Sequence, residues 1–388
     1  MRKLLLLLLT FTLTFTGLFS QNLEDLNFGS DSTLDVVSWN LEWFPTSGST
    51  TIDYVVEIIN ALDVDLIAIQ EIDETTMFYQ ILEELDGWDG ICVDSDYLEL
   101  AFLYRTDVIE DVEIVQILPG YSRELPREPL VMKMKYGGED FVIINNHLKC
   151  CGDGIMDLSD EWDEETRRFD ACNLLDDYIT VNYPDNNVIL LGDLNDILTD
   201  EPENNVFQTF LDDSENYLFT DMAIAEGNSA DWSYPTWPSH LDHIMITSEL
   251  FDEFENPSSE ILTIKVDEYL SNGWTEYENY VSDHRPVGLK LFFESTGLSK
   301  SNSIQSEVDL RNYPNPFSDY TTISFQAAKE NTTIEIYSSK GKQIKHFALT
   351  KGQTSIKWNT GDLPEGVYLA RLIYGQQLMG MKKMVLIK

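Results

Sequence analysis

One stretch near the middle of the chain constrains the fold more than any other. Residues 188–191 read Val-Ile-Leu-Leu, an apolar run with two β-branched members, which predicts a buried β-strand. Gly192 follows, and then Asp193 and Asn195, whose side chains carry oxygen atoms. Because alternate residues of an extended backbone point to the same side, we expect both side chains to face one site. A strand that simply ends in an Asp-containing turn is the alternative.

The same arrangement recurs along the chain, because other predicted strands also end or begin at polar side chains. These are Asn40, Glu71, His147, Asp242, Asp283 and His284. Together with Asp193 and Asn195 they offer hard oxygen ligands and two imidazoles but no sulfur. That set suits Mg²⁺ or Mn²⁺, with Ca²⁺ as an alternative, and a general base. The chemistry it fits is metal-assisted hydrolysis of a phosphate ester.

Apolar strands alternate with amphipathic helices over residues 33–294, which predicts a layered α/β domain. The helices are expected at 51–62, 75–85 and 164–181. Besides the strand at 188, strands are expected at 35–40, 64–69, 100–105, 129–135, 140–146, 241–246 and 285–293. Residues 295–308 are small and polar, as in a linker. Residues 309–388 contain short alternating strands between turns, which predicts a small all-β sandwich.

The first twenty residues have the pattern of a signal peptide. Arg2 and Lys3 precede the apolar run from Leu4 to Phe19, and a plausible cleavage point follows at Ser20. We therefore expect residues 1–20 to be removed on export. No other stretch is apolar over the length that a membrane span needs, so no transmembrane anchor is expected.

The charge is distributed unevenly. The whole chain has a formal net charge of -43, but residues 21–308 hold only 12 Lys and Arg against 62 Asp and Glu, a balance of -50. Such a surface repels polyanions unless salt screens it. It excludes a broad electrostatic grip on nucleic acid, so an anionic substrate would depend on a metal and a few local bases.

Four cysteines are present, namely Cys92, Cys150, Cys151 and Cys172. An even number in an exported chain allows two disulfides. Because adjacent cysteines form a strained ring, we expect Cys150 and Cys151 to pair with Cys92 and Cys172, and buried thiols are the alternative. The acidic segment 152–165 is interpreted as a solvated loop, with a calcium site as the other hypothesis.

Taken in order, the strand-end motifs resemble those of the endonuclease/exonuclease/phosphatase superfamily, which includes pancreatic-type DNases, sphingomyelinases and inositol polyphosphate phosphatases. The motifs are Trp39-Asn40, Gln70-Glu71, Asn146-His147, Gly192-Asp193-Leu194-Asn195, Leu241-Asp242-His243-Ile244 and Ser282-Asp283-His284-Arg285-Pro286. The resemblance covers most of residues 35–293. It implies a four-layered α/β sandwich, with two mixed sheets between layers of helices.

The resemblance also implies a role for each matching residue. Glu71 is expected to be the principal metal ligand, with Asn40 and Asp283 as further ligands. His284 is the expected general base, oriented by Asp242. The remaining three act on the phosphate: Asp193 and Asn195 orient the water and the phosphate, and His147 contacts or protonates it. Glu99 is near the position of a family carboxylate but out of register, so it is left out of the predicted site.

The tail resembles a second family, the type A C-terminal sorting domain of type IX secretion. The resemblance rests on Tyr313-Pro314-Asn315-Pro316-Phe317, on Leu363-Pro364-Glu365-Gly366-Val367-Tyr368 and on the closing run from Lys382 to Leu386. It implies that the type IX machinery is a partner and that the protein crosses the periplasm and outer membrane to be secreted or held at the cell surface. A binding module is the alternative.

These observations predict a secreted, divalent-metal-dependent phosphodiesterase that acts as a monomer. An extracellular endonuclease or DNase, with nucleic acid as its substrate, is the first hypothesis. A phosphoesterase acting on small or lipid substrates is the alternative, since one phosphate in a metal pocket needs no basic groove. A catalytically silent adhesin that keeps the fold is the third.

Overall fold

The structure is a computed structural model, and it describes residues 22–93, 98–293 and most of 310–386. Within the last range, residues 316, 326–331, 339–341, 362, 365 and 375–376 are outside the description. The predicted signal peptide at 1–20 and the predicted linker at 295–308 also lie outside the described residues, and so do Gln21 and Glu294 beside them. The chain divides into two compact units, Met1–Ser295 and Thr296–Lys388.

The first unit contains two mixed β-sheets. Among its described residues, six strands form the first sheet in the order β11-β12-β1-β2-β4-β3. Their bounds are β1 Thr33–Phe44, β2 Leu66–Ile72, β3 Trp88–Cys92, β4 Glu99–Arg105, β11 Glu260–Thr263 and β12 Val287–Phe292. Strands β1 and β2 run parallel, and the other neighbours in this sheet are antiparallel.

The second sheet repeats this plan in the order β5-β6-β7-β8-β10-β9 over the part of the chain that is described. Its strands are β5 Ile109–Gln116, β6 Leu130–Tyr136, β7 Glu139–His147, β8 Asn187–Asp193, β9 Tyr217–Phe219 and β10 Asp242–Thr247. Strands β7 and β8 are parallel, and the remaining pairs are antiparallel.

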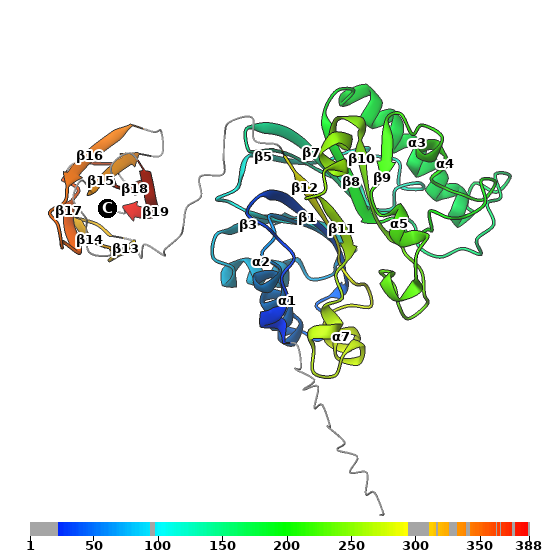
Figure 1. The fold of residues 1–388 in the computed structure, drawn as a ribbon, viewed down its shortest axis with the longest axis horizontal. Helices are drawn as coiled ribbons and strands as arrows, with labels where there is room; N and C mark the ends of the chain where they lie inside the picture. Colours follow the sequence, from blue (N-terminus) through cyan, green and yellow to red (C-terminus); the bar gives the residue numbers. More distant parts are fainter. Residues whose placement is uncertain are drawn as a thin grey trace, which may run out of the picture. The chain divides into compact units, whose positions relative to one another are not determined.

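Helices cover the outer face of each sheet (Figure 1). The longer ones are α1 Ser49–Leu62, α2 Thr75–Glu84, α7 Trp274–Tyr280 and α3 Glu164–Asn182. Shorter helices are α4 Gln208–Leu211, α5 Met222–Ala225, α6 Phe251–Glu255 and the 3-10 turns Leu23–Asp25, Ser229–Asp231, Ser248–Leu250 and Val266–Tyr269. Helices α1, α2 and α7 lie on the first sheet, and α3 and α4 lie on the second.

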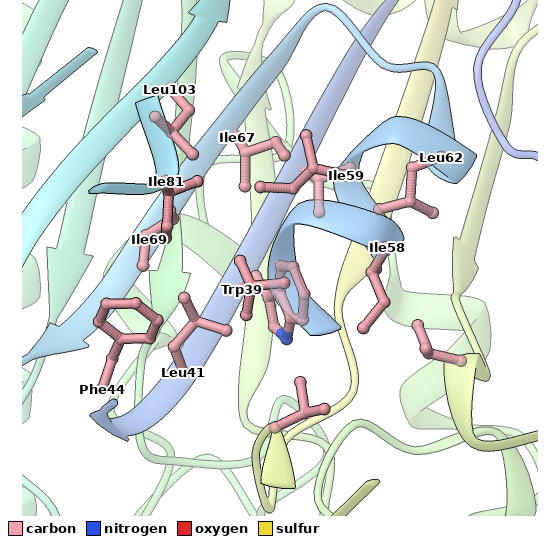
Figure 2. Close-up of a cluster of buried hydrophobic side chains, with 14 of the residues drawn as sticks. Trp39, Leu41, Phe44, Ile58, Ile59, Leu62, Ile67, Ile69, Ile81 and Leu103 are labelled. Carbon is pink, nitrogen blue, oxygen red and sulfur yellow. The ribbon is translucent and has the colours of Figure 1, made fainter. Parts of the chain in front are cut away.

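Three apolar layers hold this sandwich together. Figure 2 shows the first, where Ile58 and Leu62 of α1 pack near Trp39 of β1. A second cluster lies between the sheets and joins residues such as Val36 of β1 to Ile189 of β8. A third lies between the second sheet and α3. The layer order helix, sheet, sheet, helix confirms the predicted four-layered α/β sandwich.

The two parallel pairs explain where a site can form. In a parallel pair both strands end at the same edge, so β1 and β2 carry Asn40 and Glu71 to one edge of the first sheet. In the second sheet His147 is in register with Asp193 at the ends of β7 and β8. A buried polar link between the sheets, from Gln70 Nε2 to Asn145 Oδ1 at 2.8 Å, lies close to these ends.

The C-terminal unit is all β. Its described strands form one sheet in the order β13-β14-β17 and another in the order β16-β15-β18-β19. The bounds are β13 Arg311–Tyr313, β14 Tyr320–Ser324, β15 Thr332–Ser338, β16 Gln343–Ala348, β17 Ser355–Asn359, β18 Gly366–Tyr374 and β19 Gln377–Leu386. Ile323, Ile334 and Trp358 are among the buried residues of its own core. The predicted small all-β domain is therefore confirmed.

Two expectations were wrong or incomplete. Strands β3, β5, β9 and β11 are not predicted. They are the edge strands of the two sheets, and β9 and β11 are only three and four residues long. None of the four cysteines, all within the described residues, forms a disulfide. Cys92, on β3, and Cys172, on α3, are buried in two different apolar clusters, whereas Cys150 and Cys151 are exposed.

Candidate active site

Side chains from both sheets meet at the edge where the parallel pairs end. The Asn40 amide nitrogen donates to Asp193 Oδ2 at 2.9 Å and to Glu71 Oε1 at 3.2 Å. Asn40 and Asp193 are almost completely buried, and Glu71 is partly exposed. Asn40 therefore joins the carboxylate of the first sheet to the carboxylate of the second, as the sequence predicted for one shared site.

A histidine–carboxylate pair lies beside this cluster. His284 Nδ1 and Asp242 Oδ2 are 2.7 Å apart, and both side chains are buried. The opposite ring nitrogen, Nε2, faces the cluster at 4.0 Å from Asp193 Oδ2 and 3.9 Å from Asp283 Oδ1. A contact with Asp242 at Nδ1 fixes the ring and leaves Nε2 available for a proton from the site.

Several contacts hold His284 in this orientation. Its backbone N–H donates to Ser282 Oγ, whose hydroxyl donates to the carbonyl of Asn40 at 2.7 Å. The hydroxyl of Tyr277 donates to the His284 carbonyl at 2.8 Å. The ring of Tyr234 covers the imidazole with a centroid distance of 4.7 Å. The general base predicted from sequence is thus tied to strand β1, which also supplies Asn40.

The charges around His284 determine its proton affinity. Burial alone lowers the pKa of the imidazole, but the carboxylates of Asp242 and Asp193 outweigh that effect and raise the pKa of His284 well above its ordinary value. Burial raises the pKa of Asp193 in the same cluster. His284 and Asp193 therefore both hold their protons more tightly than the free side chains do.

His147 lies opposite, at the end of β7. Its Nε2 atom is 3.5 Å from Asp193 Oδ2 and 3.6 Å from Glu71 Oε1. Burial, followed by the nearby positive charges of Arg127 and His284, keeps the pKa of His147 well below its ordinary value. His147 is therefore a neutral imidazole, which can offer one N–H to a phosphate oxygen.

Arg127 is a residue that the sequence analysis missed. It lies in the segment before β6, and its charge acts directly on His147. A guanidinium is the side chain best suited to bind a phosphate with two parallel N–H groups. The signal in the sequence was its rarity, since only 12 basic residues occur among residues 21–308.

Glu42 is the second missed residue. Burial raises its pKa to about 7, and repulsion from Asp283 and then Glu71 adds to the effect. The backbone N–H of Glu42 donates to Asn40 Oδ1 at 2.9 Å, which turns the chain at the end of β1 toward the cluster. Because Glu42 has a positive φ of 38°, the alternation of an extended strand does not place it, and no pattern in the sequence marks it.

The cluster was tested for its fit to a divalent cation. Glu71, His147 and Asp193 offer ligand atoms within 4.8 Å of one another, and so do Asp193, Asp242 and His284. Burial raises the pKa of Asp283 as well, so at least three carboxylates here carry an electrostatic cost that a cation would remove. The donors are chiefly hard oxygens, as Mg²⁺ and Mn²⁺ require.

Unusual backbone conformations concentrate at this edge. Glu42, Trp43, Glu71 and Asn195 all have positive φ angles, which few non-glycine residues adopt. Gly192 has a φ of 143°, and a Cβ atom there would lie 1.9 Å from the carbonyl oxygen of Asn146. Glycine at this position therefore lets β8 approach β7 closely enough to align Asp193 with His147.

Asn195 corrects one step of the sequence argument. Strand β8 ends at Asp193, and Asn195 follows in a left-handed turn with φ 55°, so simple alternation does not place it. Its backbone N–H instead donates to Asp193 Oδ1 at 3.1 Å, and its amide donates to the carbonyl of Leu148 at 3.3 Å. These two hydrogen bonds, rather than strand alternation, keep Asn195 beside Asp193.

Other polar residues take structural positions outside the cluster. Arg105 pairs with Asp63 and Asp107. His243 and His240 both contact the buried carboxylate of Asp221, at 2.6 and 3.0 Å.

The family comparison agrees with this geometry. Residues 37–284 match the Endonuclease/Exonuclease/phosphatase family. The match spans well over half of the chain, so the protein belongs to this family of phosphoester-hydrolysing enzymes. No curated protein matches the chain significantly.

The chain is also similar to several solved structures, all at low sequence identity. D. rerio TDP2 complexed with a single-strand DNA product matches with a TM-score of 0.50 and 14% identity, over 68% of this chain and 100% of that chain. An endonuclease/exonuclease/phosphatase from Bacteroides vulgatus (TM-score 0.47, 15% identity) covers 68% and 100%, respectively. The mannosyl-6-phosphatase Bt3783 of Bacteroides thetaiotaomicron (0.47, 17%) covers 67% and 100%.

The tail also matches a family. Residues 311–388 match the secretion system C-terminal sorting domain, which confirms the predicted type IX sorting signal and export to the cell surface or the medium. None of the helices in the described part of the chain combines the length and apolar character that crossing a bilayer requires.

Proposed function

We propose that this protein is an exported, divalent-metal-dependent phosphodiesterase and that its substrate is extracellular nucleic acid. The contact between His284 and Asp242, opposite the Asn40-linked carboxylates of both sheets, carries the proposal. It supplies a base with a free nitrogen 4.0 Å from a buried carboxylate. A general base in this position can remove a proton from a water molecule that attacks a phosphate.

The residues divide the work as follows. His284 Nε2 takes the proton of the attacking water while Asp242 holds the other ring nitrogen and stabilises the imidazolium. Asp193 and Asn195 orient the water and the phosphate. As the new P–O bond forms, the bond to the leaving oxygen breaks and that oxygen takes up a proton from solvent, while the N–H of neutral His147 donates to a phosphate oxygen. Arg127 adds positive charge there.

Glu71, Asn40 and Asp283 would hold the cation, and Glu42 lies close enough to join them. A bound divalent ion would polarise the phosphoryl oxygen and, by neutralising the surrounding carboxylates, lower the pKa of His284 toward that of an effective base. The crowded carboxylates and their raised pKa values support this role.

The acidic surface favours a second candidate. A balance of -50 over residues 21–308 opposes the wide phosphate contacts of a DNA-binding groove. A small or lipid phosphoester needs only the local positive charges of Arg127 and a cation. The nuclease proposal instead requires salt to screen the repulsion, so the salt dependence of the rate separates the two.

A substrate panel tests the proposal. Plasmid DNA, RNA, nucleotides, sphingomyelin and a sugar phosphate are incubated with Mg²⁺, Mn²⁺ or Ca²⁺ and with EDTA. We expect metal-dependent nicking of DNA whose rate rises with moderate salt, the reverse of a basic nuclease. Turnover of a small phosphoester without nicking at any salt concentration would establish the second candidate. The His284→Ala variant is the negative control.

A further inference from the structure

Two neighbouring thiols lie next to the active site. Cys150 and Cys151 follow β7 by three and four residues, both are exposed, and their sulfur atoms are 3.0 Å apart. We propose that they form a reversible vicinal disulfide in the exported protein, and that the state of this ring alters the active site. The expected cross-pairing with Cys92 and Cys172 is replaced by a bond within the loop itself.

The positions of the other two cysteines favour this pairing. Cys92 is buried on β3 in the helix-covered core of the first sheet, and Cys172 is buried on the inner face of α3. Cys150 and Cys151 are the two exposed thiols. Burial also raises the pKa of the Cys172 thiol, which makes it a poor nucleophile. An oxidant that approaches from solvent therefore meets Cys150 and Cys151 first.

The local contacts indicate which sulfur reacts first. The Lys149 ammonium is 3.5 Å from the Cys150 sulfur, and the Cys151 S–H donates to the same atom. An ammonium and an S–H donor therefore both lie against the Cys150 sulfur. The hydrogen bond to Cys150 raises the pKa of the Cys151 thiol, so Cys151 reacts second.

The oxidant is a disulfide, either that of a thiol–disulfide oxidoreductase or oxidised glutathione. The Cys150 thiolate attacks one oxidant sulfur, the oxidant's S–S bond breaks and a mixed disulfide forms. The Cys151 sulfur then attacks Cys150 and releases the second oxidant sulfur. Two cysteine thiols lose two electrons and two protons in total, and the oxidant becomes two thiols.

Geometry makes this bond easy to reduce again. Adjacent Cα atoms are only about 3.8 Å apart across a trans peptide, below the spacing of about 4.4 Å or more in ordinary disulfides. Cys151 already has a positive φ of 73°, so the loop is bent at the required place. A strained, exposed disulfide is of the labile kind rather than the structural kind.

The loop is tied to the catalytic residues by its backbone. One Arg168 nitrogen donates to the carbonyls of Lys149 and Cys151 at 2.8 and 2.7 Å, while its Nε donates to Asp196, the residue after Asn195. The preceding carbonyl, that of Leu148, accepts from Asn195. Cys151 and Asn195 also line the same cavity of about 520 Å³. We expect closing the ring to shift the Lys149 and Cys151 carbonyls, and through Arg168 and Asp196 the turn that carries Asn195.

Peptide mass mapping tests the ring without any activity assay. Full-length protein is exported, purified without reductant, alkylated and digested under non-reducing conditions. We expect the peptide with Cys150 and Cys151 to be about 2 Da lighter than its reduced form and unalkylated. Cys92→Ser and Cys172→Ser should keep the mass loss, and Cys150→Ser should abolish it. Alkylation of both residues in native protein, even after oxidised glutathione, would overturn the proposal.

A rate comparison tests the link to the site and rests on the proposed function. Reduction by a phosphine, which does not compete for the metal, should change the kcat/KM of the wild type by at least about 3-fold, because it shifts the partner of Asn195. The Cys150→Ser variant should not respond. Equal rates for oxidised and reduced wild type would refute the link, while the mass map still decides whether the ring exists.

Discussion

Replacing Asp242 by Asn tests how this site handles a proton. The side chain keeps its shape and an oxygen acceptor 2.7 Å from His284 Nδ1, but it loses its charge. Two unit charges about 4 Å apart at an effective dielectric constant of about 20 interact by about 4 kcal/mol. The imidazolium formed in the transition state loses that stabilisation, so we expect kcat to fall by about 10³-fold.

The pH dependence gives the substitution a second readout. Asp242 is the strongest of the groups that raise the pKa of His284. Without its charge the pKa of His284 falls, so the rise of kcat with pH should move to lower pH in Asp242→Asn at saturating Mg²⁺. A loss of less than about tenfold, or an unmoved pH profile, would remove Asp242 from its role as the orienting carboxylate.

Asp221→Asn is the matched control. Asp221 is as buried as Asp242 and also contacts a histidine, His243, at 2.6 Å. The pair lies outside the cluster that we propose as catalytic. Breaking it should cost about 3–5 kcal/mol of unfolding free energy in urea, while the folded fraction keeps most of its kcat. A change of kcat equal to that of Asp242→Asn would show that the assay reports misfolding.

Three further predictions follow from the same contacts. The pKa of His243 is raised and that of Asp221 is lowered in the folded protein, so the stability that this pair contributes is complete between about pH 4 and 6.5. That contribution is lost as pH rises through the folded pKa of His243 or falls through the folded pKa of Asp221. Urea titrations of wild type and Asp221→Asn at several pH values measure it. Arg127→Ala should lower kcat/KM by about 10-fold or more, whereas Arg105→Ala, which removes a surface ion pair, should leave it unchanged. Mg²⁺ at 100 times its Kd should stabilise the folded protein by about 2.7 kcal/mol, measured by thermal unfolding. Glu42→Gln should weaken the binding of Mg²⁺, measured by calorimetry. If the Tm does not shift on adding Mg²⁺, Mn²⁺ or Ca²⁺, the metal assignment is contradicted.

Much of this site is readable from the sequence because its parts sit at the ends of apolar strands. Asn40, Glu71 and Asp193 each follow a run that is buried on both faces, and such runs are visible without knowledge of tertiary structure. What the sequence does not contain is the distance between the two sheets. The 2.9 Å contact between Asn40 and Asp193 exists only because the inter-sheet layer sets that distance.

Residues outside the strands were harder to predict. Arg127 precedes β6 in an irregular segment, so no periodicity marks it, and Glu42 depends on a positive φ of 38° that only the folded turn imposes. The cysteine prediction failed for a similar reason. It assumed that Cys92 and Cys172 would meet Cys150 and Cys151, whereas Cys92 and Cys172 are enclosed in two separate apolar clusters and Cys150 and Cys151 are exposed.

The division of the site between two sheets has a consequence for how activity responds to distant change. Asn40 and Glu71 move with the first sheet, whereas His147 and Asp193 move with the second. A small slide of one sheet over the other would therefore alter the reaction geometry while every strand stayed intact. Side chains in the layer between the sheets, such as Val36 and Ile189, set the distance between the two halves of the site although they lie outside it.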